Sequence, residues 1–132
     1  MDNNFIATSP SEQLLAGRVN GERIIAGSTA HEALMKTSFD NETFLLIPNN
    51  IMTEDDVKQY IRAKFRVSEE IISMIEQVYP DPSLSCGLYN DMQSRVAAIS
   101  GEAIFNCPSY WLAQAFPSGH AYSYEWQSAG PS

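Results

Sequence analysis

Two segments near opposite ends of the chain have the pattern of β-strands, and the clearly patterned segments between them are helical. Residues 22–27, ERIIAG, form a short apolar run that ends in glycine. Residues 121–126, AYSYEW, alternate aromatic and polar side chains, as strands do. Because an isolated pair of strands is only marginally stable, these two must pair with each other or belong to a larger sheet. The sequence therefore predicts a mixed α/β fold that is mostly helical.

The central part of the chain predicts a helical hairpin. Thr53 and Ser68 are typical N-cap residues, and acidic residues follow each of them, where the helix dipole favours negative charge. Apolar residues then recur at helical spacing until Pro80. If the chain lacks the rest of its sheet, apolar stripes are left partly exposed, which favours self-association. We expect this of Ile71, Ile75 and Val78, and of Trp111 and Phe116.

Capping signals predict helices on both sides of this hairpin. Ser9 is expected to cap a short helix over SPSEQLLAG, with Glu12 completing a capping box. A further helix is expected to begin at Asn90, to continue past a glycine at position 101, and to restart with Pro108 in a first turn. No internal repeat is visible in the sequence, so the 132 residues are expected to form one domain.

Composition excludes several classes of partner. The chain has 16 acidic and 8 basic residues and a formal net charge of −8. Binding to nucleic acid needs clustered lysine and arginine, and a membrane surface needs a polybasic patch, so we expect neither partner. The first ten residues, MDNNFIATSP, lack the basic and apolar regions of a secretory signal, and no apolar run is long enough to span a bilayer. A cytoplasmic location is the default expectation.

Residues that could carry chemistry are few. His31 and Glu32 follow the first strand, where they could begin a metalloprotease motif, form part of a triad, or simply face solvent. The metalloprotease motif needs a second histidine four residues after His31, and Met35 stands there, so no metal site is expected. The two cysteines, Cys86 and Cys107, are too few for a disulfide framework and are expected to be unbonded to each other.

No nucleophile is evident either. Ser128, in QSAG, lacks the glycine that a nucleophile elbow requires two residues before the serine. His120 precedes the second strand and has no nucleophile positioned beside it, so a surface histidine is the better interpretation. From the residues alone, Glu32 is best interpreted as a solvent-facing glutamate.

Four stretches in order resemble the type-B carboxylesterases, the cholinesterase-like branch of the α/β-hydrolases. They are residues 1–20, with a Phe and a Leu-rich short helix ending in glycine; 23–34, a strand followed by a polar turn and Glu32; 100–116, which contains FNCP; and 121–126, the Tyr-x-Tyr strand. The resemblance spans essentially the whole chain and implies a fragment of an α/β-hydrolase fold.

The resemblance implies a function for Glu32 and for the chain. In that family the glutamate after this strand is the acid of a Ser-Glu-His triad that hydrolyses small-molecule esters without a cofactor. The nucleophile elbow precedes this segment in the family and the catalytic His-Gly follows it, so this chain is expected to hold Glu32 alone and to be inactive by itself. Two alternatives stay open: a small acidic interaction module without catalysis, and a truncated gene product.

Overall fold

The computed structural model describes residues 8–30, 33, 36–39, 42–45, 47–48 and 50–127. The chain forms two compact units, and we call Met1–Ala30 with Ala103–Ser132 the sheet unit and His31–Glu102 the helical unit. Helices and a two-stranded parallel sheet occur together, in agreement with the predicted α/β class. Among the described residues, no helix is long and apolar enough to cross a membrane.

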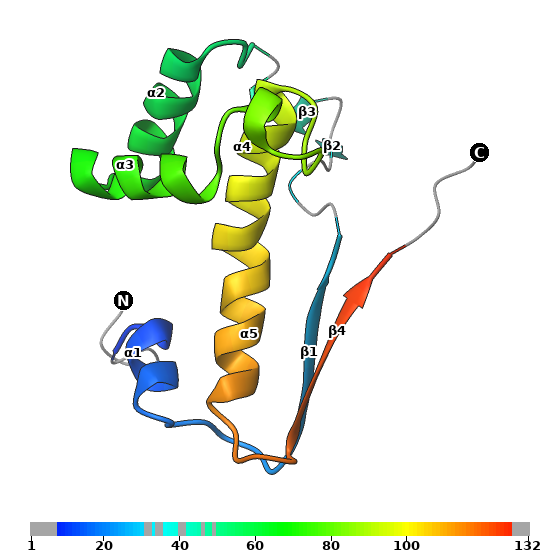
Figure 1. Ribbon diagram of the computed structural model, residues 1–132. Helices are drawn as coiled ribbons and strands as arrows, with labels where there is room; N and C mark the ends of the chain where they lie inside the picture. Colours follow the sequence, from blue (N-terminus) through cyan, green and yellow to red (C-terminus); the bar gives the residue numbers. More distant parts are fainter. Residues whose placement is uncertain are drawn as a thin grey trace. The chain divides into compact units, whose positions relative to one another are not determined.

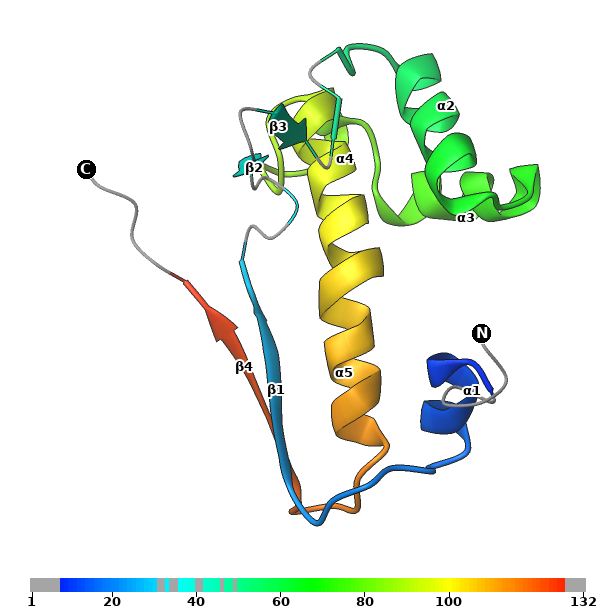
Figure 2. The ribbon, with the colours of Figure 1, turned by 180° about the vertical axis from the view of Figure 1, so that it is seen from behind.

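The sheet unit is built around the two predicted strands, which pair directly. β1 (Ile24–Thr29) and β4 (Ala121–Trp126) lie side by side and run parallel, with Ile24 opposite Ala121 (Figures 1 and 2). The second strand has its predicted bounds, whereas the first begins and ends two residues later than predicted. Helix α5 (Cys107–Gln114) packs against both strands.

The short first helix of the sheet unit follows its capping signals. α1 (Pro10–Leu15) begins after Ser9, whose hydroxyl accepts the backbone N–H of Glu12, while the Glu12 carboxylate accepts the backbone N–H of Ser9. The predicted capping box is therefore confirmed. Gly17 follows the helix with φ of 64°, a left-handed conformation that glycine adopts without steric cost.

The helical unit contains the predicted hairpin and a strand pair that was not predicted. β2 (Lys36–Phe39) and β3 (Glu42–Leu45) form an antiparallel pair. They are followed by α2 (Glu54–Phe65), α3 (Glu69–Val78), a 3₁₀ turn η2 (Pro82–Leu84) and α4 (Met92–Gly101). Each of the two short strands has only four residues, too few for a clear alternating pattern.

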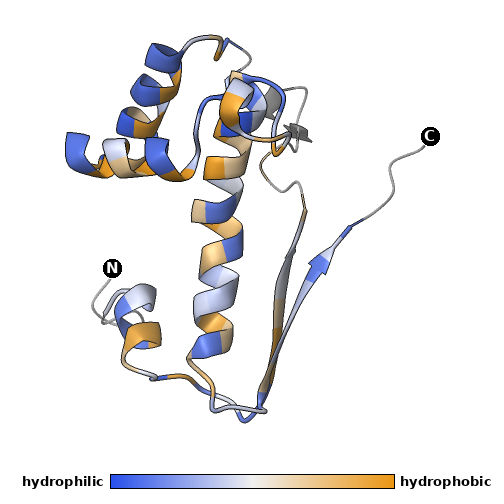
Figure 3. Cartoon of the chain, in the orientation of Figure 1, coloured by the Kyte–Doolittle hydropathy of each residue, from blue (hydrophilic) through white to orange (hydrophobic). Residues whose placement is uncertain are grey.

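The helical unit has its own apolar core. Hydrophobic and hydrophilic residues are interspersed along α2 and α3, as expected for amphipathic helices (Figure 3). Thr53 and Ser68 cap these two helices as predicted. The buried members of the core are Ala33, Ile47, Ile51, Val57, Tyr60, Ile61, Ile72, Val96, Ala97 and Ile99.

The start of α4 corrects one prediction by a single residue. The N-cap is Asp91 rather than Asn90, because the Asp91 carboxylate accepts the backbone N–H of Ser94 over 2.7 Å. Beyond Gly101 the chain continues as a π-helical segment, η3 (Glu102–Asn106), and then as α5, in agreement with a glycine that interrupts the helix without ending it.

Among the described residues of the helical unit, Arg95 is the most deeply buried charged side chain, with an exposed fraction of 1%. Its Nη1 donates to Glu54 Oε2 over 2.5 Å, and its Nε donates to the backbone carbonyl of Tyr79 over 2.8 Å. Arg95 thus links the start of α2 to the end of α3. The hydrogen bond from Arg95 lowers the pKa of Glu54, against the opposing effect of partial burial.

The apolar stripes are partly exposed, as predicted. Ile71, Val78 and Trp111 have large exposed fractions, but Ile75 packs against the core of the helical unit. Phe116 is buried as well, with only 9% of it exposed. It lies beyond the end of α5, where its ring approaches Gly21.

The turn between α2 and α3 yields a stability prediction. Arg66 caps α2 in the left-handed conformation, with φ of 53°, and its side chain is exposed. A non-glycine residue pays a steric cost in this conformation, and glycine does not. Glycine also gives the unfolded chain more conformational freedom, which offsets part of the gain. Arg66→Gly is therefore expected to raise the free energy of unfolding by about 0.5–1 kcal/mol. Urea denaturation measures the change. Arg66→Ala, which keeps the steric cost, is the control, and equal stability of the two variants would contradict the prediction.

Candidate functional site

The edge of the sheet unit at the carboxyl ends of its strands is the candidate site. Thr29 stands opposite Trp126, and the backbone N–H of Ala30 donates to the carbonyl of Trp126 over 3.0 Å. The residues that follow β1 and those that follow β4 therefore leave the sheet at the same edge. In parallel sheets this is the edge at which ligands and catalytic groups are usually placed.

The predicted site residue, Glu32, lies outside the described residues, as do His31 and Ser128. In the sequence, Glu32 follows Ala30 by two positions, and Ala30, the last described residue of this segment, bonds to β4. The structure thus describes the strand that precedes Glu32 in the sequence but not the glutamate.

His120 lies at the opposite edge of the sheet. Its backbone carbonyl accepts the N–H of Ile24 over 2.9 Å, and its Nδ1 donates to the carbonyl of Glu22 over 2.8 Å. Both contacts are at the amino ends of the strands, a full strand length, about 20 Å, from the carboxyl ends. His120 is exposed, in agreement with its interpretation as a surface histidine.

A polar pocket of about 300 Å³ lies between α5 and the two strands. The Ser109 hydroxyl donates to the backbone carbonyl of Gly27 over 3.3 Å, and not to a basic side chain that could activate it as a nucleophile. The amide oxygen of Asn106 is buried without a hydrogen-bond partner. No sequence signal marked this pocket, because the π-helical segment that places Asn106 cannot be recognised from residue pattern. Its lining is Gly27, Ser28, Asn106, Ser109, Tyr110, Ser123, Tyr124 and Glu125.

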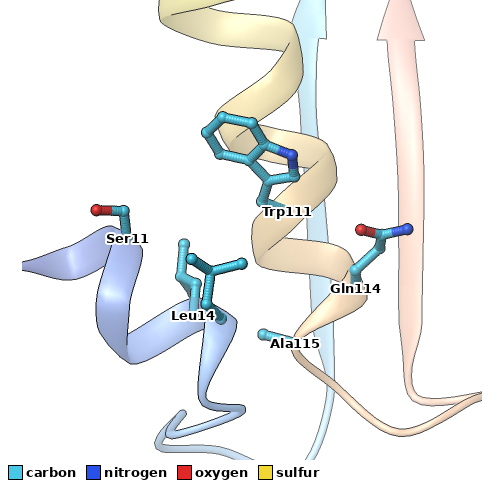
Figure 4. A pocket seen from close by; sticks show the side chains of 6 residues that line it. Ser11, Leu14, Trp111, Gln114 and Ala115 are labelled. Carbon is cyan, nitrogen blue, oxygen red and sulfur yellow. The ribbon is translucent and has the colours of Figure 1, made fainter.

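A second pocket of the sheet unit, of about 340 Å³, lies between α1 and α5. Leu14 and the indole ring of Trp111 lie on its two sides, and Ser11 and Gln114 contribute polar groups (Figure 4). These side chains can contact an apolar group, but they include no acid, base or strong nucleophile.

The two thiols and the acidic residues do not form a metal centre in the described part of the chain. Cys86 is exposed, with φ of 54°, and Cys107 is partly buried at the start of α5; both are free. No group of three or more histidine, cysteine or carboxylate side chains could hold a metal ion among the described residues.

Gly27 permits the close pairing of the two strands. A Cβ at this position would lie 2.2 Å from the backbone oxygen of Tyr124. Gly27→Ala is therefore expected to destabilise the sheet unit by about 1–3 kcal/mol, the usual cost of overpacking. Thermal unfolding followed by tryptophan fluorescence reports on this unit through Trp111 and Trp126.

Gly101→Ala is the matched control for this change. Its added Cβ would meet only the Cβ of Ala33, at 3.8 Å, which is ordinary van der Waals contact. We expect this variant to unfold at the temperature of the unchanged protein or slightly above it, because alanine is a better helix former than glycine. Equal unfolding temperatures for the two alanine variants would show that Gly27 is not a close contact.

Comparison with protein-family models and with curated proteins finds no match for this chain.

Proposed function

We propose that this chain is the acid-bearing part of a carboxylic ester hydrolase of the type-B family, with Glu32 as the acid of a Ser-Glu-His triad. The observation that supports the proposal is the parallel register of β1 and β4, in which Ala30 bonds to Trp126. A residue shortly after β1 and a histidine supplied after β4 would start from the same edge of the sheet.

The chemistry assigns each triad member a role. The Glu32 carboxylate accepts the Nδ1–H of the histidine and fixes its tautomer, so that Nε2 removes the proton of the serine hydroxyl as that oxygen attacks the ester carbonyl. The carboxylate stabilises the imidazolium that results. Acyl transfer through a serine needs no metal or cofactor. The serine and the histidine are expected outside the 132 residues, and the substrate is a small-molecule ester.

The flanking coding sequence tests the proposal. We expect the transcript to encode a Gly-x-Ser-x-Gly segment upstream and a His-Gly segment downstream. The joined chain should hydrolyse a short activated ester such as p-nitrophenyl acetate. The 132-residue chain and its Glu32→Gln variant should both match the buffer rate. A transcript without these motifs, or Glu32-dependent turnover by the isolated chain, would refute the proposal.

A second function, that of a non-catalytic interaction module, is favoured by the exposed apolar side chains. Such a module must fold without further strands. A sharp unfolding transition of a monomer, independent of protein concentration, would favour it over the esterase segment, which should be marginally stable alone. Large exposed hydrophobic residues of the sheet unit are Leu15, Ile25, Tyr110, Trp111, Tyr122, Tyr124 and Trp126.

A further inference from the structure

The outer edge of β4 has unpaired backbone groups. The carbonyls of His120 and Trp126 both accept hydrogen bonds from the β1 segment. Since successive residues of a strand direct their N–H and C=O groups to opposite sides, Ala121, Ser123 and Glu125 direct theirs away from β1. In the described part of the chain no partner meets them, because β1 is the only strand paired with β4.

One face of the same sheet is apolar and is left exposed by the described part of the chain. Tyr122, Tyr124 and Trp126 alternate along β4 and have exposed fractions of 59%, 55% and 65%. Ile25 of β1 stands opposite Tyr122, and 72% of it is exposed. Edge strands are normally protected by lysine, proline or a bulge, and AYSYEW contains no lysine or proline.

We propose that two copies of this chain associate by antiparallel pairing of their β4 outer edges, with a two-fold axis at Tyr124. The pairing would turn two two-stranded sheets into one four-stranded sheet, which is large enough for independent stability. The inference concerns β4 alone and does not rest on the role proposed for Glu32.

The sequence of β4 is self-complementary in this register. Tyr124 meets its own copy, and Tyr122 meets Trp126, so three aromatic pairs lie on one face. Glu125, the only charged residue of the strand, meets Ser123, and these two exchange backbone hydrogen bonds because both direct their N–H and C=O groups outward.

Neighbouring registers are less favourable. A shift by one residue moves the aromatic side chains of one copy to the opposite face of the sheet. A shift by two residues in one direction places Glu125 against its own copy, and like charges directly opposite are destabilising. The same shift in the other direction places Trp126 against His120 and leaves two aromatic pairs. Pairing at Tyr124 therefore maximises aromatic contact without placing like charges opposite each other.

Oligomeric state is the first test. Sedimentation of the purified chain should give a species of twice 14.7 kDa that dissociates on dilution. Ser123→Pro removes an outward N–H without removing a hydrogen bond to β1, so it should give a monomer with an unchanged circular dichroism spectrum. The Glu32→Gln variant should dimerise like the unchanged chain. A monomer at all concentrations, or a Ser123→Pro variant that still dimerises, would overturn the proposal.

Cysteine cross-linking tests the register. In a background with Cys86→Ser and Cys107→Ser, Tyr124→Cys should form an intermolecular disulfide under oxidised glutathione. The two Cα atoms of this non-hydrogen-bonded pair would be about 4.5 Å apart, within disulfide range. Ser123→Cys in the same background should stay unlinked, because each copy of residue 123 meets residue 125. A dimer that links through position 123, or through neither position, would refute the proposed interface.

Discussion

Glu32→Gln in the joined esterase is expected to lower the turnover number by about 10⁴-fold, the loss that follows when a triad histidine is held in the wrong tautomer. Glutamine offers an amide in place of a carboxylate, so it cannot stabilise the imidazolium that forms as the serine attacks. The effect should fall on kcat rather than on KM, since Glu32 does not contact the ester. Initial rates with p-nitrophenyl acetate over a range of concentrations separate the two constants.

Glu22→Gln provides a matched control within the same strand region. Glu22 is exposed and precedes β1, at the amino edge of the sheet, where its carbonyl accepts from His120. The substitution removes one carboxylate at the amino edge of the sheet, and the enzyme should keep its turnover. A neutral Glu32→Gln, or equal losses in the two variants, would remove Glu32 from the triad.

Glu54→Gln is expected to lower the free energy of unfolding of the helical unit by about 2–3 kcal/mol, because it leaves the buried Arg95 guanidinium without its carboxylate. Adding Arg95→Met should restore part of this loss, since an apolar side chain of similar length leaves no unpaired charge in the interior. Urea denaturation of the unchanged chain, the two single variants and the double variant completes the cycle. A double variant less stable than Glu54→Gln alone would contradict this account.

The exposed pair of Arg62 and Glu69 is the control for this cycle. Its geometry is good, with hydrogen bonds of 2.7 and 2.8 Å, but both side chains are largely in solvent. Glu69→Gln should therefore lower the free energy of unfolding by less than about 1 kcal/mol. Burial of one partner, rather than the length of the hydrogen bond, is the expected source of the difference.

The pH dependence of the free energy of unfolding gives a second readout of the ion pair between Glu54 and Arg95. Because the pKa of Glu54 is lowered in the folded protein, the unfolded state binds its proton first as the pH falls. The contribution of Glu54 is complete above its unfolded pKa of 4.5 and is lost as the pH falls through the lower, folded value. Glu54→Gln should consequently flatten the stability profile in that acidic range.

Local signals in the sequence were sufficient for most helix boundaries. Thr53 and Ser68 cap their helices through hydrogen bonds to residues three positions away, so the information is contiguous. At the third boundary the predicted cap was Asn90, and the carboxylate of the next residue, Asp91, forms the cap. Which of two adjacent residues caps a helix depends on backbone geometry that residue type alone does not determine.

Features that depend on distant residues could not be predicted. Arg95 appeared on an ordinary helix, and its burial follows from Glu54 and Tyr79, which approach it only in the folded unit. Within the stripe of Trp111 and Phe116, the residue patterns did not indicate which ring is buried. Phe116 is the buried one, because the chain leaves α5 before that residue and its ring lies near Gly21. That both strands end at the same edge of the sheet could be anticipated only once their parallel direction was known.

The order of the two units along the sequence has a consequence for synthesis on the ribosome. The helical unit occupies His31–Glu102, between the two halves of the sheet unit, so the ribosome completes it while β4 is still untranslated. The helical hairpin is held by contacts between near neighbours in the chain and can form early, whereas β1 must wait for a partner that is 97 positions distant, as Ile24 is from Ala121. During that interval the apolar strand at Ile24 and Ile25 is without β4, which makes the nascent chain most vulnerable to chaperone capture and to aggregation before β4 emerges.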